Sequence, residues 1–335
     1  MKKALFFKKE DSLLRCLLCR HSCKIEEGRA GICKVRKNIK GELFSLNYGK
    51  LVAKNIDPIE KKPFYHFFPA SRAYSIASWG CNFRCPFCQN WKISQTEEFK
   101  RWGGGYFQAD PLTIVNLAKS SGCKSISYTY TEPTVFFEFA LEVAELAKKE
   151  GLYNNFVTNG YISREALKEI SPFLDACNVD LKSFREDFYS GLCGAKLKGV
   201  LDSIEYMKEL GIWVELTTLI ISGYNDTRQE LKDLCKWIVK LDKNIPWHIS
   251  RFYPHYKFKD IEPTPLETLE QAYKIAKEEG LSYVYIGNIY TSYGENTYCP
   301  ECGQLLIERE GFYVLRNNLK EGFCPNCQNN IEGVF

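Results

Sequence analysis

Three cysteines in one short segment are the residues with the clearest capacity for chemistry. Cys81, Cys85 and Cys88 lie in the segment 80–88, GCNFRCPFC, with the spacing C-x3-C-x2-C. Thiolates are ligands for zinc and for iron–sulfur clusters. A structural zinc ion needs four ligands, and no fourth Cys or His lies within ten residues of this segment. Three thiolates on a cubane cluster would leave one iron open to chelate a small molecule through an amine and a carboxylate. A zinc ion that borrows His66 or a distant thiol is the alternative.

This segment follows the first of a series of expected strands. Between residues 70 and 290, short apolar runs alternate with helical patterns, which is typical of a parallel sheet. We predict an α/β fold, a full or partial parallel (β/α) TIM-like barrel, because polar motifs follow the strands at their carboxyl ends. A doubly wound open sheet is the alternative. The expected strands are 73–79, 124–130, 153–159, 175–181, 212–220, 246–253 and 282–287, and the expected helices are 111–121, 133–150, 163–170, 198–210, 227–241 and 266–279.

The cysteine loop resembles that of the radical S-adenosylmethionine (radical SAM) enzymes. Their C-x3-C-x2-C motif has an aromatic residue before the third cysteine, here Phe87, which we expect beside the cofactor. The resemblance covers the middle segment, and it implies that Cys81, Cys85 and Cys88 ligate a [4Fe–4S] cluster. It also implies that S-adenosylmethionine binds the open iron and is cleaved by one electron to a 5′-deoxyadenosyl radical, which abstracts a hydrogen atom. The cofactor then supplies the difficult chemistry, while the protein orients it and excludes water.

The segment 128–133, YTYTEP, stands where many members of this family carry a Gly-Gly-Glu element that holds the methionine amine. Glu132 matches the Glu, but both glycines are replaced. The resemblance therefore implies that Thr129, Thr131 or their carbonyls contact the amine. The alternative for Glu132 is a carboxylate at a helix N-terminus, stabilised by the helix dipole.

Further polar motifs follow the later strands. Asn159, in the triplet TNG, has an amide that suits a ribose or a carboxylate, and a plain Asn-Gly turn is the alternative. Asp180 and Lys182 share one face of a strand because they are two residues apart. They could bind ribose hydroxyls and the cofactor carboxylate, or form a structural ion pair. His248 shares a strand face with Ser250, and the order of these motifs resembles the branch of pyruvate formate-lyase activating enzyme, which implies that His248 also contacts the cofactor.

A narrower resemblance rests on the segments CLLCRHSC, SYTYTEPT, ISGYND, WHISRFYPHYKF and YIGN. Together they are similar to the radical SAM component of the AmmeMemoRadiSam system, whose genes accompany a Memo-like protein and a protein of the AMME-syndrome candidate family. The resemblance implies hydrogen abstraction from a small molecule or a peptide in a Memo-associated system, with reduced flavodoxin or ferredoxin as electron donor. One alternative is an activase that forms a glycyl radical on a partner protein. The other is a non-catalytic zinc-binding scaffold.

Two C-P-x-C knuckles near the end of the chain, within residues 295–335, predict a second metal site. Cys299 and Cys302 come before a hairpin-like stretch, and Cys324 and Cys327 come after it, which is the spacing of a zinc ribbon. The zinc would be structural, because so short a segment cannot fold without such a staple. A rubredoxin-like iron site is the alternative.

A third cysteine group lies in the N-terminal segment 1–60. Its spacing suits a metal, and zinc is the expected ion; an auxiliary iron–sulfur cluster, which could relay electrons or bind substrate, is the alternative. The group consists of Cys16, Cys19, Cys23 and Cys33, with His21 as a fifth candidate ligand. Nearby arginines predict a solvated basic face on which an acidic redox donor could dock. These arginines are Arg20, Arg29 and Arg36.

The composition narrows the class of protein. The chain has 335 residues, 45% of them hydrophobic, which is enough for a sizeable core. Its net charge of +4 gives no support to a nucleic-acid-coating protein, and it has no apolar run that could span a membrane. Fifteen cysteines without a signal peptide indicate metal binding in a reducing compartment, so we expect a cytoplasmic protein. The four ungrouped thiols, which we expect to be buried, are Cys123, Cys177, Cys193 and Cys235.

Overall fold

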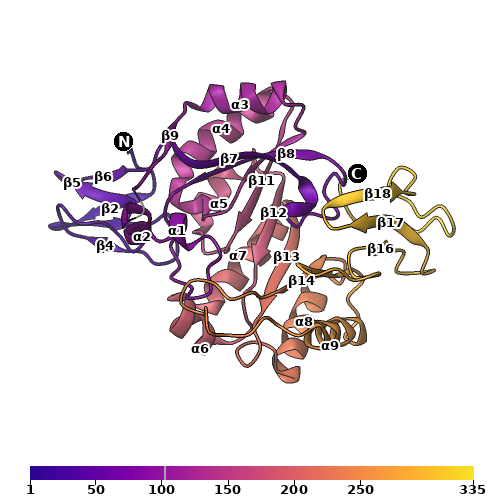
Figure 1. Ribbon diagram of the computed structural model, residues 1–335. Helices are drawn as coiled ribbons and strands as arrows, with labels where there is room; N and C mark the ends of the chain where they lie inside the picture. The colour runs from indigo at the N-terminus through magenta and orange to yellow at the C-terminus, as the bar shows by residue number, and fades with distance from the viewer. Residues whose placement is uncertain (102) are drawn as a thin grey trace.

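The computed structural model describes residues 1–101 and 103–335, and a large, mostly parallel sheet forms its centre (Figure 1). The strands of this sheet run in the order β15-β14-β13-β12-β11-β10-β8-β7-β9. Strands β8 and β10 to β15 run parallel to one another and are buried on both faces, which explains their continuous apolar sequences. The strands are β7 Lys50–Pro58, β8 Arg72–Ser78, β9 Phe107–Gln108, β10 Ser125–Tyr128, β11 Tyr153–Thr158, β12 Ala176–Asp180, β13 Trp213–Ile220, β14 Trp247–Arg251 and β15 Val284–Gly287.

The strand order confirms the predicted partial barrel. From β8 to β15, each parallel strand lies beside the strand that follows it in the chain, with no reversal of direction across the sheet. A doubly wound sheet has such a reversal at its switch point, so that alternative is wrong. The sheet is open, with β9 and β15 at its edges.

Helices follow the parallel strands and pack against them. Several begin at side-chain caps that the sequence encodes: Asp110, Ser163 and Thr227 each accept a hydrogen bond from a backbone N–H in the first turn. No helix in the described residues is long and apolar enough to cross a membrane. The α-helices are α1 Trp91–Ser94, α2 Thr96–Arg101, α3 Pro111–Ser120, α4 Phe137–Lys149, α5 Arg164–Ile170, α6 Glu186–Phe188, α7 Leu197–Glu209, α8 Arg228–Asp242 and α9 Leu266–Glu278; the shorter turns are η1 Ile59–Lys61, η2 Pro133–Phe136 and η3 Tyr189–Cys193.

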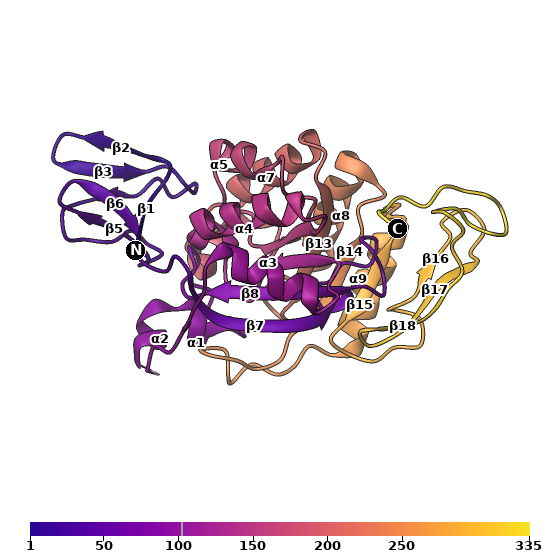
Figure 2. The same ribbon diagram turned by 90° about the horizontal axis from the view of Figure 1, so that it is seen from above.

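Small antiparallel sheets flank the central sheet at opposite ends (Figures 1 and 2). At the N-terminal end, β1, β6 and β5 form one sheet and β2, β3 and β4 form another. At the C-terminal end, β16, β17 and β18 form a third. Their bounds are β1 Lys2–Lys3, β2 Phe7–Glu10, β3 Leu13–Cys16, β4 Lys24–Ile25, β5 Arg36–Ile39, β6 Glu42–Ser45, β16 Thr297–Tyr298, β17 Leu305–Glu310 and β18 Tyr313–Asn317.

The chain passes from the N-terminal sheets straight into the central one. Strand β7 pairs antiparallel with β8 along most of its length, from Leu51 opposite Ser78 to Pro58 opposite Arg72. The central sheet therefore begins at Lys50, before the parallel series starts. This strand brings Asp57 and the residues after it to the edge of the sheet that carries the site described below.

A buried ion pair fastens the N-terminal sheets to the helices of the central domain. Arg36 and Glu138 are each 2% exposed, and their Nη1 and Oε1 atoms lie 2.7 Å apart. Glu138 also accepts a hydrogen bond from the Leu5 N–H at 2.8 Å. The expectation of a basic face is wrong for Arg36, which is buried, and Arg20 donates to the Ile162 carbonyl and to Ser203. Within the described residues, the exposed arginine of the three is Arg29.

We predict that Glu138→Ala lowers the free energy of unfolding by about 3–5 kcal/mol, because it leaves the Arg36 charge buried and unpaired. The matched control is Glu209→Ala, which breaks the exposed Arg164–Glu209 pair and should cost at most about 1 kcal/mol. Chemical denaturation measures both. Equal losses in the two variants would contradict the anchoring role of the buried pair.

Candidate functional site

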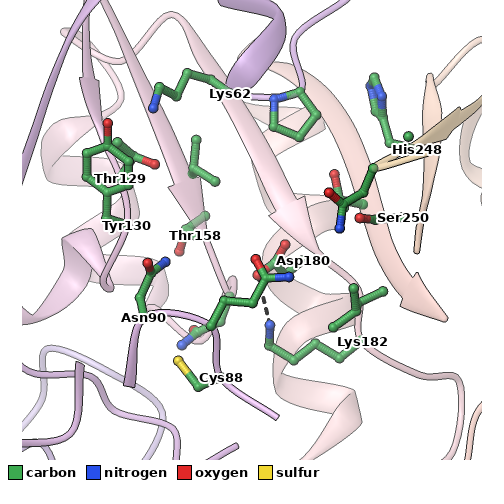
Figure 3. Close-up of a pocket in the computed structure, with 18 of the residues that line it drawn as sticks. Lys62, Cys88, Asn90, Thr129, Tyr130, Thr158, Asp180, Lys182, His248 and Ser250 are labelled. Carbon is green, nitrogen blue, oxygen red and sulfur yellow. Dashed lines mark hydrogen bonds and ion pairs between the residues drawn. The ribbon is translucent and has the colours of Figure 1, made fainter. Parts of the chain in front are cut away.

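The carboxyl ends of the parallel strands surround one cavity of about 490 Å³. Figure 3 shows its side chains converging from several strands, with Thr129 and Tyr130 on one side and His248 and Ser250 on the other. Parallel pairing causes this convergence, since it brings the carboxyl ends of all strands to the same edge. The cavity brings together the predicted residues Cys81, Cys85, Phe87, Cys88, Thr129, Thr131, Glu132, Asn159, Asp180, Lys182 and His248, all of which line it.

The three cysteines reach the cavity on the loop that follows β8. Backbone and amide donors hold the Cys81 sulfur: the Phe83 N–H at 3.3 Å and the Asn159 Nδ2 at 3.7 Å. Phe87 is buried and packs against two aromatic rings of later segments, Phe188 and Phe258, with ring centroids 5.7 and 5.9 Å away. The loop is therefore fixed by contacts at both ends of the motif.

The geometry of the thiols suits a cluster better than a single ion. In the part of the chain that the structure describes, the four C-terminal cysteines, whose sulfurs lie within 4.8 Å of one another, could hold a single metal ion, and the central triad forms no such group. His66 is not a fourth ligand, because its Nδ1 lies 2.6 Å from the Glu332 carbonyl and its Nε2 lies 2.6 Å from the Tyr285 hydroxyl. Three spread thiols beside a 490 Å³ cavity match a cubane cluster with room for a small molecule at its fourth iron.

A fourth thiol, which the sequence did not connect with this loop, lies next to it. Cys193 ends η3, and its side chain is hydrogen-bonded to Cys85, which lowers the pKa of the Cys85 thiol. The Cys193 carbonyl also accepts the Arg84 N–H at 2.9 Å. The sequence could not predict this contact, because Cys85 lies on the loop after β8 whereas Cys193 ends η3, which follows β12. As expected, Cys123, Cys177 and Cys235 are also buried.

Glu132 lines the cavity, but its carboxylate is already bound by the protein. One oxygen accepts from the Thr134 N–H at 3.0 Å and from the Thr158 hydroxyl at 2.8 Å, and the other accepts from the Asn159 N–H at 2.8 Å. Burial raises the pKa of this carboxyl, and these donors oppose the rise. The arrangement favours the helix N-terminal role, because Glu132 caps η2, and it makes Glu132 a positioning residue for the ends of β10 and β11.

The turn before Glu132 has an unusual backbone. Tyr130 has φ +63°, and the Thr131 N–H donates to the Thr129 carbonyl at 2.7 Å. A non-glycine residue in this conformation is uncommon and is concentrated at functional sites. The Thr131 hydroxyl donates to the Ser78 carbonyl at 2.6 Å, which ties the turn to β8 next to the cysteine loop.

Asn159 braces the cysteine loop. Its Nδ2 donates to the Asn82 Oδ1 at 2.7 Å as well as to the Cys81 sulfur, and its Oδ1 accepts the Tyr161 N–H at 3.0 Å. The amide thus has protein partners at both ends. Like Glu132, it acts in this structure through the residues that it holds.

Asp180 and Lys182 form an ion pair inside the cavity, as Figure 3 shows, with 2.8 Å between Oδ2 and Nζ. Burial alone would lower the pKa of Lys182, but Asp180 and the nearby thiols raise it well above its usual value. The Asp180 side chain is 40% exposed, so its carboxylate can still accept hydroxyl donors of a bound molecule.

His248 faces the cavity with its ring held from behind. Its Nε2 lies 2.7 Å from the Oε2 of Glu215, which is fully buried on β13 and also accepts the N–H groups of Tyr65 and His66. Burial alone would raise the pKa of Glu215, but the hydrogen bond and charge of His248 lower it overall. The sequence analysis did not single out Glu215, because a single acidic residue within an apolar strand forms no recognisable motif.

A second cation on the cavity wall also escaped the sequence analysis. Lys62 is 2% exposed, its Nζ lies 2.7 Å from the Oδ2 of Asp57, and it sits 4.2 Å from the ring centre of Tyr130. Tyr130 donates its hydroxyl hydrogen bond to Asp57. Burial lowers the pKa of Lys62 to about 8, although Asp57 opposes the shift. The proline-rich stretch around these residues predicted only an extended connection.

The two terminal cysteine groups differ in geometry. At the C-terminus, Cys299 lies 3.6 Å from Cys327 and Cys302 lies 3.7 Å from Cys324, sulfur to sulfur, and all four sulfurs fall within 4.8 Å of one another. At the N-terminus, the thiols instead line a small cavity of about 10 Å³ together with His21. The thiols of that group are Cys16, Cys19, Cys23 and Cys33.

Comparison with known proteins gives the family of the chain. Residues 76–238 match the model of the radical SAM superfamily. An uncharacterized protein of Methanocaldococcus jannaschii is 45% identical over the full length of both chains. The chain belongs to the radical SAM superfamily, whose members are enzymes that use S-adenosylmethionine and an iron–sulfur cluster, and it is therefore an enzyme.

More distant relatives agree with this assignment. The pyruvate formate-lyase-activating enzyme of Clostridium pasteurianum is 24% identical over 59% of this chain and 87% of its own. In structure, the chain is similar to SuiB of Streptococcus suis in complex with the precursor peptide SuiA, with a TM-score of 0.51, 14% identity, and coverage of 69% of this chain and 52% of SuiB. At 14% identity, the similarity to SuiB concerns the fold alone.

We predict that Glu132→Gln lowers the free energy of unfolding of the protein without cofactor by about 1–3 kcal/mol. The reason is that an amide NH₂ replaces an acceptor that faces several buried donors. Glu150→Gln, on the exposed Lys119–Glu150 pair, is the matched control and should change stability little. If Glu132 served mainly as a cofactor ligand, the variant would unfold like the wild type, and this result would contradict the positioning role.

Proposed function

We propose that this enzyme cleaves S-adenosylmethionine reductively in the 490 Å³ cavity, with a [4Fe–4S] cluster on Cys81, Cys85 and Cys88. The observation that carries the proposal is the meeting of three spread thiols with the polar strand ends in one cavity. When bound, the cluster and its cofactor would supply a 5′-deoxyadenosyl radical for hydrogen abstraction. A reduced flavodoxin or ferredoxin, the donor that radical SAM enzymes typically use, would deliver the electron.

The residues of the cavity divide into ligands and positioning groups. We assign the contacts with S-adenosylmethionine to Thr129, Thr131, Asp180, Lys182 and His248, whose side chains or adjacent carbonyls face the cavity. The Asp180–Lys182 pair offers an acceptor for hydroxyls beside a donor for a carboxylate. Phe87, Glu132 and Asn159 support these contacts by fixing the cysteine loop and the ends of β10 and β11.

The far wall of the cavity belongs to the substrate side in this proposal. It includes Lys62 from the stretch after β7, Asn288 after β15 and Phe312 from the turn between β17 and β18. All three lie outside residues 76–238, the part that the family model matches. This wall combines a cation, an amide and an aromatic ring, which fits a small molecule or a peptide side chain with an anionic or polar group. In line with the sequence resemblance, we place the reaction in a Memo-associated system.

A second candidate function is the activation of a glycyl-radical enzyme. The similarity to the activating enzyme of Clostridium pasteurianum favours it, because the match covers 87% of that relative. An activase requires a large glycyl-radical protein as its partner, whereas the first proposal predicts Memo-type neighbours. The genes that flank this one therefore discriminate between the two.

We predict that the anaerobically reconstituted protein, with a strong reductant, converts S-adenosylmethionine to 5′-deoxyadenosine and methionine. Cys85→Ala should reduce this turnover to the background of the reductant alone, because the cluster loses one of its three protein ligands. Cys123→Ala, at a buried thiol outside the cavity, is the control and should retain activity. Undiminished turnover in Cys85→Ala would refute the assignment, and a colourless protein that holds only zinc would instead support the scaffold alternative.

For the C-terminal group we propose a structural zinc ion on Cys299, Cys302, Cys324 and Cys327. A tetrahedral site with Zn–S bonds of about 2.3 Å separates its sulfurs by about 3.8 Å. The paired sulfur distances of 3.6 and 3.7 Å agree with that value. The ion would secure the sheet that carries Phe312 to the cavity.

We expect metal analysis of the anaerobically purified protein to find about one zinc ion at this group. Cys302→Ala should lose that zinc and lower the thermal unfolding temperature, because a structural zinc site contributes directly to folding. The iron at the central loop should be unaffected. Iron in place of zinc at the C-terminal group would show the rubredoxin-like alternative, and the absence of any metal there would contradict both.

A further inference from the structure

We propose that Arg309, on the C-terminal sheet, is a positioning residue for His248, and that the C-terminal segment thereby contributes to the binding of S-adenosylmethionine. Arg309 belongs to β17, whose sheet lies next to β15 (Figure 2). The sequence analysis predicted a structural metal site in this segment and no link to the cavity. The effect on the cofactor rests on the proposed function, whereas the coupling of Arg309 to His248 rests on the contacts that join them.

The side chain of Arg309 is fully buried, although it comes from a small flanking sheet. Its Nη2 donates to the Tyr65 carbonyl at 2.9 Å, and its guanidinium carbon lies 4.2 Å from the centre of the Tyr65 ring. Its Nε lies 3.7 Å from the Oε1 of Glu60, which is also fully buried. Burial raises the pKa of Glu60, and the charge of Arg309 opposes this rise. Arg309 therefore ties the C-terminal sheet to the stretch of chain that follows β7.

Tyr65 carries this contact to the cavity. Its N–H donates to the Glu215 Oε2 at 3.0 Å, and the same oxygen lies 2.7 Å from the His248 Nε2. Its ring packs edge-on against the His248 ring, with centroids 4.8 Å apart. Tyr65 thus contacts His248 and also holds the carboxylate that orients it. A single residue, Tyr65, separates Arg309 from His248.

A second path joins the same two residues through β15. The ring of Tyr285 is stacked on the His248 ring, with centroids 5.1 Å apart. The Tyr285 hydroxyl lies 2.9 Å from the Thr297 hydroxyl, which accepts a hydrogen bond from the Arg309 Nη1 at 2.8 Å. The aromatic rings that contact His248 are therefore themselves held by Arg309, one directly and one through Thr297.

The consequence for binding concerns the second ring nitrogen of His248. Because Nε2 is turned to Glu215, Nδ1 is the nitrogen that remains for a molecule bound in the cavity, which His248 lines (Figure 3). A hydrogen bond tolerates displacements of only a few tenths of an ångström. A shift of Tyr65 or Tyr285 that moves the His248 ring therefore weakens a contact between Nδ1 and the cofactor.

The coupling is tested by NMR of the full chain before the iron–sulfur cluster is reconstituted, since a paramagnetic cluster would broaden nearby signals. The chain has four histidines, so ¹³C labelling of histidine gives four Cε1–H signals, and His248→Gln identifies that of His248. Arg309→Met should shift this signal, because the rings of Tyr65 and Tyr285 lie close enough for their ring currents to act on it. Arg316→Met, at an exposed arginine on β18, is the matched control and should leave the signal in place.

The effect on the cofactor is tested in the reconstituted enzyme by equilibrium dialysis of S-adenosylmethionine, without reductant so that no cleavage occurs. Arg309→Met should raise the dissociation constant at least about tenfold, the effect of one lost hydrogen bond to a charged group. Its iron content should equal that of the wild type and of Arg316→Met. Arg309→Lys keeps the cation but loses the planar guanidinium fork, so it should fall between the wild type and Arg309→Met in both measurements.

Thermal unfolding verifies that each variant is folded, and Arg309→Lys decides alone if Arg309→Met does not fold. A His248 signal that stays in place would overturn the coupling, because a residue that only holds the C-terminal sheet would change stability and nothing else. Failure of both variants to fold would also overturn it. A shifted signal with unchanged affinity would instead contradict the proposed contact of His248 with S-adenosylmethionine. If the wild type itself does not bind S-adenosylmethionine, the proposed function fails and the NMR result still decides the coupling.

Discussion

Parallel pairing of the strands is the constraint on which the site depends. Because β8 and β10 to β15 run in one direction, their carboxyl ends lie at the same edge of the sheet, and the polar groups that follow them share one cavity. These polar groups lie far apart in the sequence, because each follows a different strand. The cysteine loop, the acid–base pair on β12 and the histidine on β14 meet only because the strands place them there.

A layer of buried hydrogen bonds holds these groups in position. Glu132 joins the ends of β10 and β11, Asn159 extends that link to Asn82 and Cys81, and Glu215 orients His248. The bond between Asn159 and the Cys81 sulfur is partly buried and the other bonds are buried, where a lost partner costs more than at the surface. The cavity is thus pre-organised in the protein alone. A reactive radical needs such fixed surroundings, since its selectivity depends on what lies within reach.

The sequence predicted the parallel sheet because each strand has a continuous apolar run and each helix a separate amphipathic pattern. It also predicted the central cysteines, whose spacing is local. It could not predict that β7 pairs with β8, that Lys62 faces the cavity, or that Cys193 touches Cys85, because each contact joins segments that only the folded chain brings together.

The central claim is that the loop of Cys81, Cys85 and Cys88 leaves one iron open to S-adenosylmethionine in this cavity. Electron–nuclear double resonance of the reduced protein, with S-adenosylmethionine carrying ¹⁵N in its methionine amine, observes that contact directly. The account predicts a resolved ¹⁵N hyperfine coupling to the reduced cluster. A spectrum without this coupling, in a sample where the cofactor is bound, would contradict it.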